Sequence, residues 1–275
     1  MKKTMNVRNE LDHIKEINEL FESVPDSKIN YSDWSNVEFK FSKPIDVHCF
    51  TDVHIGHRSF DKPKFLKAII EVQNNPNAYC FFNGDQLDFT PSGHHNARNE
   101  QSMTNEEQVK FFNRLLEKLG NKVLWIRHGN HELRQVDKAA NPLFDEYCRI
   151  LKVPVLKTGM DRCHIYIGKK KWSICSSHGI GLNSQKCLER MQLVDKESTT
   201  FFVGHTHQFF EDTNYYGKFY DKTNNKDVNE PIFVICGGSF EKYDGHAIDK
   251  NMRPTNTGYY ILTLTETERL LRKVL

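Results

Sequence analysis

The sequence of 275 residues lacks several features that would assign it to a class at once. It has no apolar run of the roughly 20 residues that a membrane-spanning helix needs, and the lysines after Met1 are not followed by the apolar segment of a signal peptide. Its formal net charge is only +2, whereas domains that bind nucleic acid through the backbone are usually strongly basic. We therefore expect a soluble, cytoplasmic protein without a membrane partner, for which DNA is not the favoured ligand.

Disulfide and zinc-ribbon patterns are also missing. The seven cysteines form an odd set without a C-x-x-C pair, and several lie in apolar segments, so they are expected to be buried, reduced thiols. Hydrophobic residues make up 38% and aromatic residues 12% of the chain, which is enough for a packed core. Neither an internal repeat nor a low-complexity segment is present.

The N-terminal part reads as a separate helical extension. Residues 9–23 place apolar side chains at helical spacing, and Val24-Pro25 ends the pattern. We assign residues 1–40 to this extension and 41–275 to a catalytic domain. The apolar stripe either packs on that domain or binds a partner, such as a second copy of the chain.

From about residue 45, apolar strands alternate first with helices and then with hairpins. Helices are expected over 61–73 and from the Thr104/Glu107 capping box to Gly120, and a hairpin over 212–230. Helices between early strands and hairpins between later ones predict an α/β fold (α+β by some schemes) with two packed mixed β-sheets flanked by helices. The expected strands cover residues 47–51, 79–82, 123–126, 164–167, 172–175, 201–203, 232–236 and 259–264.

Five short motifs rich in metal ligands stand where expected strands end, the position at which open α/β sheets bind ligands. They offer carboxylates, imidazoles and an amide oxygen, which are ligands for divalent metals. In chain order the motifs are Asp52-Val53-His54, Gly84-Asp85-Gln86-Leu87-Asp88, Gly129-Asn130-His131-Glu132, Ser177-His178-Gly179 and Gly204-His205-Thr206-His207.

The order of these motifs resembles the calcineurin-like metallophosphoesterase superfamily, whose signature is D-x-H, G-D-x-x-D, G-N-H-[DE], a later His and G-H-x-H. The resemblance implies a four-layer sandwich and a binuclear metal centre in which Asp85 bridges two divalent ions. It places one ion on Asp52, His54, Asp85 and His207, and the other on Asp85, Asn130, His178 and His205.

The resemblance also implies a mechanism for hydrolysis of a phosphoester. A hydroxide bridging the metals would be the nucleophile, and His131 would contact the phosphate and protonate the leaving group. Asp88 would orient His131 through a carboxylate–imidazole hydrogen bond. Glu132 is expected to make a supporting hydrogen bond and not to bind metal. Nitrogen and oxygen ligands admit Mn²⁺, which is our first choice, and also Fe²⁺, Zn²⁺ or Ni²⁺.

The expected substrate is a small-molecule or nucleotide phosphoester, cleaved by a phosphodiesterase or phosphatase activity. A DNA exo- or endonuclease of the double-strand-break repair branch is one alternative, because Asp52-Val53-His54-Ile55-Gly56 is similar to its D-x-H-x-G motif. A non-catalytic binding scaffold is another. A protein phosphatase is disfavoured, since Phe89-Thr90 stands where that branch has Arg-Gly. Candidate substrate contacts are His57, His94, His95 and Arg98, although a surface loop with chance histidines fits them equally well.

Overall fold

The computed structural model describes residues 36–89, 100–136, 148–156, 159–179, 183–221, 226–243 and 254–275. The helix expected over residues 9–23 and the candidates His94, His95 and Arg98 lie outside the described residues. Within the described ranges, no helix is both long and apolar enough to cross a membrane.

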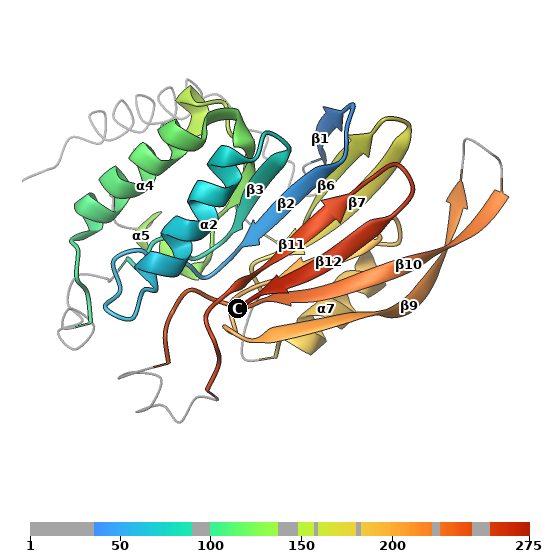
Figure 1. The fold of residues 1–275 in the computed structure, drawn as a ribbon. Helices are drawn as coiled ribbons and strands as arrows, with labels where there is room; N and C mark the ends of the chain where they lie inside the picture. Colours follow the sequence, from blue (N-terminus) through green and yellow to red (C-terminus); the bar gives the residue numbers. More distant parts are fainter. Residues whose placement is uncertain are drawn as a thin grey trace, which may run out of the picture. The chain divides into compact units, whose positions relative to one another are not determined.

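Two mixed six-stranded sheets form the framework, as the sequence predicted (Figure 1). The first sheet has the order β1 (Asn36–Phe41), β6 (Asp161–Ile167), β7 (Lys170–Ser177), β8 (Thr200–Val203), β10 (Lys226–Gly237) and β9 (Phe209–Asp221). The second sheet has the order β12 (Arg269–Val274), β11 (Tyr259–Leu264), β2 (Ile45–Phe50), β3 (Ala78–Asn83), β4 (Val123–Arg127) and β5 (Val155–Leu156).

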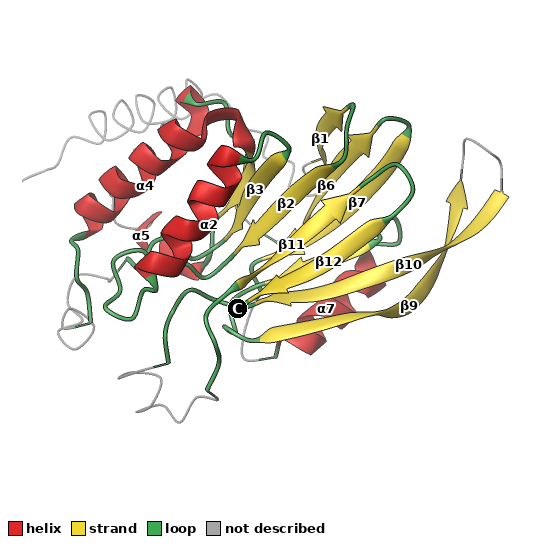
Figure 2. Cartoon of the chain, in the orientation of Figure 1, coloured by secondary structure: helices red, strands yellow, loops and turns green. Residues whose placement is uncertain are grey.

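Helices complete the layers on the outer faces of the sheets (Figure 2). Helices α2 (Lys62–Asn74) and α4 (Asn105–Leu119) pack on the second sheet, and α7 (Ser184–Val194) packs beside β8 of the first. Short segments α5 (Asn130–Val136) and the 3₁₀ turn η1 (Gly120–Lys122) follow and precede β4, respectively. The expected α/β sandwich is confirmed.

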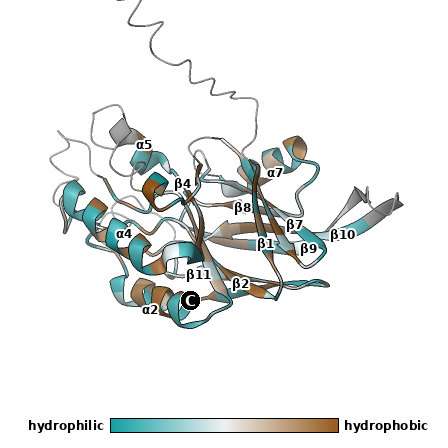
Figure 3. Cartoon of the chain, turned by 90° about the horizontal axis from the view of Figure 1, so that it is seen from above, coloured by the Kyte–Doolittle hydropathy of each residue, from teal (hydrophilic) through white to brown (hydrophobic). Residues whose placement is uncertain are grey.

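Two apolar cores separate these layers. One lies between the sheets and includes Phe81, Trp125 and Phe202, and the Phe81 and Trp125 rings stack at 4.2 Å. The other lies between the second sheet and the helices, around Phe65 and Phe112. Each fully buried aromatic side chain of this kind contributes about 2–3 kcal/mol by leaving water. Helices α2 and α4 are amphipathic, and Figure 3 shows both hydrophilic and hydrophobic residues along each of them.

Local sequence signals explain the main helices. Thr104 and Glu107 form the predicted capping box at the start of α4, and Gly120 follows its end. The carboxylate of Asp61 caps α2 by accepting from the Lys64 N–H. The helices expected over 61–73 and from Thr104 to Gly120 and the hairpin over 212–230 are present, while β1, β5, β12, α5 and α7 were not expected. Strand β1 lies across the boundary that we placed at residue 40.

Strand direction determines where the five motifs meet. Strands β2, β3 and β4 are parallel neighbours in the second sheet, and β7 and β8 are parallel neighbours in the first. Each motif begins within two residues of the end of one of these strands. The carboxyl ends of the strands therefore bring all five motifs to one edge of the sandwich.

Candidate metal centre

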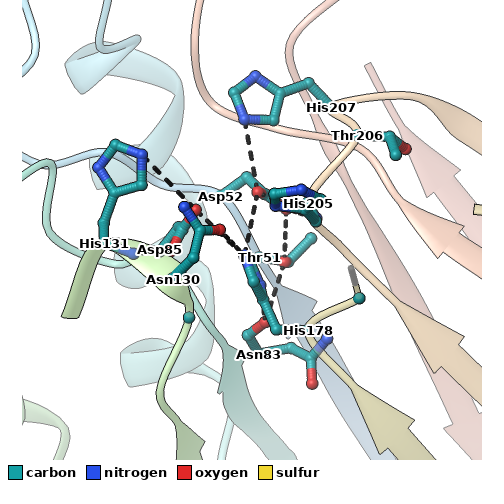
Figure 4. Close-up of polar contacts among 12 residues, drawn as sticks. Thr51, Asp52, Asn83, Asp85, Asn130, His131, His178, His205, Thr206 and His207 are labelled. Carbon is teal, nitrogen blue, oxygen red and sulfur yellow. Dashed lines mark hydrogen bonds and ion pairs between the residues drawn. The ribbon is translucent and has the colours of Figure 1, made fainter. Parts of the chain in front are cut away.

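Side chains from the five motifs converge at the strand ends (Figure 4). They form three overlapping groups of ligand atoms. Within each group the ligand atoms all lie within 4.8 Å of one another. The groups are Asp52, His54 and His207; His54, Asp85 and His131; and Asp85, His178 and His205. The groups form one continuous cluster, because the first two share His54 and the last two share Asp85.

The backbone at these residues adopts an uncommon conformation. Asp52, His54 and Asp85 have φ values of 49°, 50° and 52°, and His205 and His207 have values of 73° and 56°. Residues other than glycine rarely adopt positive φ, and such strain concentrates at functional sites. Most of the described non-glycine residues with positive φ are thus residues that the motifs nominated as metal ligands.

Two motif glycines are required by close approach of the strand-end loops. A Cβ on Gly129 would lie 2.1 Å from the Asp85 Oδ1 atom, and one on Gly204 would lie 2.0 Å from the Thr51 Oγ1 atom. Neither separation is compatible with a side chain. These glycines let the loops approach until their ligands share one site.

We call Asp52, His54 and His207 the first half-site. The Nε2 atoms of His54 and His207 face each other at 3.1 Å, and the His207 Nε2 atom lies 3.4 Å from Asp52 Oδ1. The other Asp52 oxygen, Oδ2, accepts hydrogen bonds from Thr51 Oγ1 at 2.6 Å and from the His205 N–H at 2.9 Å. The same His205 N–H also lies 3.1 Å from Oδ1, the oxygen that faces His207.

In the first half-site, a carboxylate lies beside the Nδ1 atom of each histidine ring, away from the Nε2 atoms that face each other. His54 Nδ1 lies 3.3 Å from Asp88 Oδ1, and His207 Nδ1 lies 3.2 Å from Glu241 Oε2. A carboxylate beside Nδ1 favours the tautomer with its proton on Nδ1, so the Nε2 lone pair points inward. Two such lone pairs and a carboxylate oxygen then face one point, and a cation at that point satisfies all three.

The second half-site consists of Asp85, Asn130, His178 and His205. His178 Nδ1 donates to the backbone carbonyl of Asn83 at 2.8 Å, so in the neutral ring Nε2 carries the lone pair. That atom lies 3.1 Å from Asp85 Oδ2 and 3.2 Å from Asn130 Oδ1. Acceptors converge here too, and the donor set of nitrogen and oxygen atoms fits a divalent metal.

Electrostatics favour positive charge on one ring of each half-site, His178 and His207, whereas burial and the charge of His178 lower the pKa of His205. Burial by itself lowers the pKa of His178, but the charges of Asp85 and Asp52 outweigh it and raise that pKa to about 9. The pKa of His207 is likewise raised, because Asp52 and Glu241 outweigh its burial. Burial raises the carboxyl pKa of Asp85, yet the His178 charge prevails and lowers it. Metal binding would replace the ring protons and release them.

His131 lies beside the shared carboxylate. Its backbone N–H donates to Asp85 Oδ1 at 2.9 Å, and its ring Nε2 lies 3.9 Å from Asp85 Oδ2. Its ring Nδ1 contacts the backbone carbonyl of Asp88. The Asp88 carboxylate is 3.8 Å from that Nδ1 but 3.3 Å from His54 Nδ1, so its nearer imidazole is His54 and not the one we expected. Burial lowers the pKa of His131 despite the nearby carboxylates.

Glu132 joins the loops without facing the cluster. It is fully buried, and its carboxylate accepts from the N–H groups of Asp85 at 3.0 Å, Leu87 at 2.9 Å and Gly129 at 2.8 Å. These bonds fix the loop that carries the shared carboxylate.

The candidate substrate contact His57 is buried, with its ring Nδ1 3.4 Å from Glu241 Oε1. Glu241 itself was missed, as were the supporting roles of Thr51 and Asn83. A signal for Glu241 was present: Gly237-Gly238-Ser239-Phe240-Glu241 follows β10, the neighbour of β8, and so ends at the same edge.

No family model and no curated protein matches the chain. Among solved structures, it is similar to a metallophosphoesterase from Sphaerobacter thermophilus, with 14% identity, a TM-score of 0.42, and 84% of this chain and 89% of that chain covered. A single mutant of Vps29 from Entamoeba histolytica has 14% identity, a TM-score of 0.44, and coverages of 83% and 91%. NAD nucleotidase from Haemophilus influenzae has 12% identity, a TM-score of 0.41, and coverages of 84% and 49%. These likenesses concern the fold alone.

Proposed function

We propose that this protein is a binuclear metal-dependent phosphoester hydrolase. One observation carries the proposal. Three groups of ligand atoms overlap, the first two through His54 and the last two through Asp85, and in each half-site a histidine has its Nδ1 bonded from outside, so that its Nε2 faces carboxylate oxygens. Such a constellation binds a pair of cations, and paired divalent ions are the common solution for hydrolysis of phosphoesters.

Two divalent ions, with Mn²⁺ as the first choice, fit the donor set. Asp52, His54 and His207 would hold one ion, His178, His205 and Asn130 the other, and Asp85 both. When bound, such ions neutralise charge on the phosphate oxygens and make a water-derived nucleophile available near neutral pH.

His131 is the residue of this chain that we assign to proton transfer. Because a backbone carbonyl can only accept, the contact of its Nδ1 with Asp88 places a proton on Nδ1. A second proton, on Nε2, is then the one available to the leaving oxygen. The side chain is 20% exposed and is fixed at its backbone by Asp85, so it can reach a substrate at the centre. A bound phosphate would favour the protonated ring, offsetting the burial that lowers its pKa.

The substrate that we favour is a small-molecule or nucleotide phosphoester. The near-neutral net charge supports this choice over long DNA, whose binding depends on many contacts with phosphates. Neither the nuclease nor the scaffold alternative has a specific contact in its favour among the described residues.

The test is turnover by Mn²⁺-loaded protein on bis(p-nitrophenyl) phosphate, p-nitrophenyl phosphate and end-labelled DNA. We expect cleavage of the aryl esters, and His131→Ala should lower turnover by about 10²–10⁴-fold while keeping its metal content. The deficit should grow with an alkyl leaving group, which depends more on protonation than p-nitrophenolate does. His164→Gln, a change at a buried histidine of β6 that bonds to Ser173, is the control and should retain turnover.

Any other result of these assays would favour one of the alternative functions or refute the metal centre. Degradation of DNA that disappears in His131→Ala would replace our choice with the nuclease. Bound metal without turnover on any substrate would indicate the scaffold. A protein that takes up no divalent ion would refute the metal centre itself.

A further inference from the structure

We propose that Glu241 is a positioning residue that orients His207 and gives the first half-site its higher affinity for a divalent ion. This inference rests on the proposed metal centre. It assigns a function to a residue outside the five motifs, located after β10.

The contacts of the Glu241 carboxylate place it between two histidines. Oε2 lies 3.2 Å from His207 Nδ1, and Oε1 lies 3.4 Å from His57 Nδ1. Only 14% of the Glu241 side chain is exposed, so its charge is poorly screened by solvent. A carboxylate at Nδ1 fixes the ring plane and makes Nε2 a stronger ligand.

The backbone of this segment is tied to the loop that carries Asp52. The Phe240 N–H donates to the Asp52 carbonyl at 3.0 Å, and Ser239 Oγ donates to the same carbonyl at 2.9 Å. Ser239 Oγ also accepts from the Glu241 N–H at 2.9 Å. Phe240 is fully buried and packs against Phe50 and Phe65. Glu241 is therefore held in place independently of its contact with His207.

The two half-sites differ in the groups that contact the Nδ1 atoms of their histidines. His54 and His207 are each held by a carboxylate, from Asp88 and Glu241, whereas His178 is held by the neutral carbonyl of Asn83. Two extra negative charges thus lie behind the first half-site. Removing one should weaken the ion bound there, while the ion on His178 and His205 keeps its direct surroundings.

The experiment is titration of the full-length protein with Mn²⁺, read by equilibrium dialysis and by the EPR signal of free Mn²⁺. Glu241→Gln keeps the shape of the side chain and removes its charge. We expect two sites in the wild type and, in this variant, one site weakened by about 10–100-fold with the other unchanged. Glu100→Gln is the matched control: it removes a charge 3.9 Å from His57 Nε2, on the far side of that ring from Glu241, and should leave both sites unchanged.

A double variant tests whether the effect passes through His207. In a His207→Ala background, Glu241→Gln should cause no further loss, because its partner is already gone. The proposal is overturned if Glu241→Gln leaves both affinities unchanged, weakens both equally, or still lowers affinity without His207. A wild type that binds two Mn²⁺ ions keeps the metal centre in each of those cases, whereas one that binds none refutes both.

Discussion

Buried histidines occur in two regions of this molecule, and their surroundings give them opposite electrostatic character. His48 lies in the middle of β2, stacked on Tyr259 at 5.5 Å, and burial lowers its pKa to about 4. His178 and His207 stand at strand ends, with 6% and 20% of their side chains exposed, and the pKa of each is raised because carboxylates outweigh the burial. One region excludes positive charge and the other gathers it.

This difference shows what distinguishes a ligand from a core residue. Removal from water disfavours the charged imidazole in both places. What differs is that a carboxylate oxygen lies 3.1 Å from His178 Nε2 and 3.2 Å from His207 Nδ1. At His131, whose carboxylate neighbours lie 3.8 and 3.9 Å away, burial prevails and the pKa is lowered. Replacing the carboxylates beside His178 and His207 should therefore lower the pKa of these histidines toward that of a core histidine such as His48.

The largest effect is expected from Asp85→Ala, because Asp85 is the carboxylate that we propose to bridge the two ions and is a member of two of the three ligand groups. The variant should lose both ions and with them turnover, since each ion would lose a proposed ligand. Elemental analysis of the purified protein measures the metal content directly. Asp46→Ala removes a carboxylate of β2 that accepts from Thr263 Oγ1, away from the centre, and should keep both ions. Full occupancy in Asp85→Ala would refute the bridging role.

A smaller effect is expected at His48. Its folded pKa of about 4 lies below the unfolded value of 6.5, so the neutral ring stabilises the fold above pH 6.5. That contribution falls as the pH drops through this window, by up to about 3 kcal/mol at about 1.4 kcal/mol per pKa unit. His48→Phe should keep the stacking and lose this part of the acid sensitivity.

Urea unfolding of both proteins at pH 7.5 and pH 4.5 measures the effect of His48. Carboxylates and the other histidines titrate in both proteins, so the informative quantity is the difference between the two pH dependences. Identical pH dependences would contradict the assignment of an uncharged core histidine.

Much of the fold followed from sequence because its signals are local. The capping box at Thr104 and the apolar runs of β3 and β4 are complete within a few residues. Strand β12 was missed because its sequence, RLLRKV, does not alternate apolar and polar residues as a half-buried strand does, and it lies at the edge of its sheet. The order of strands in the sheets depends on pairings between distant segments, which no local pattern encodes.

The ligand candidates could be named from sequence because each belongs to a short motif at a strand end. Their partners could not, since the relevant contacts join residues far apart in the chain. The Asp88 carboxylate lies nearer to His54 than to His131 because the turn at Asp88, where Phe89 has a φ of 31°, presents its carbonyl to His131 instead. Glu241 reaches His207 only after β10 has aligned beside β8.

The smallest effect on Mn²⁺ binding is expected at Thr51, because its side chain is neutral and is not itself a proposed ligand. Its hydroxyl donates to Asp52 Oδ2 at 2.6 Å and so helps to direct Oδ1 toward His207. Thr51→Val keeps the shape and removes the donor, which should cost about 1 kcal/mol and weaken Mn²⁺ binding at the first half-site about fivefold. Thr51→Ser keeps the hydroxyl and should bind like the wild type. Equal losses in both variants would mean that packing of the Thr51 methyl group, and not the hydrogen bond, orients Asp52.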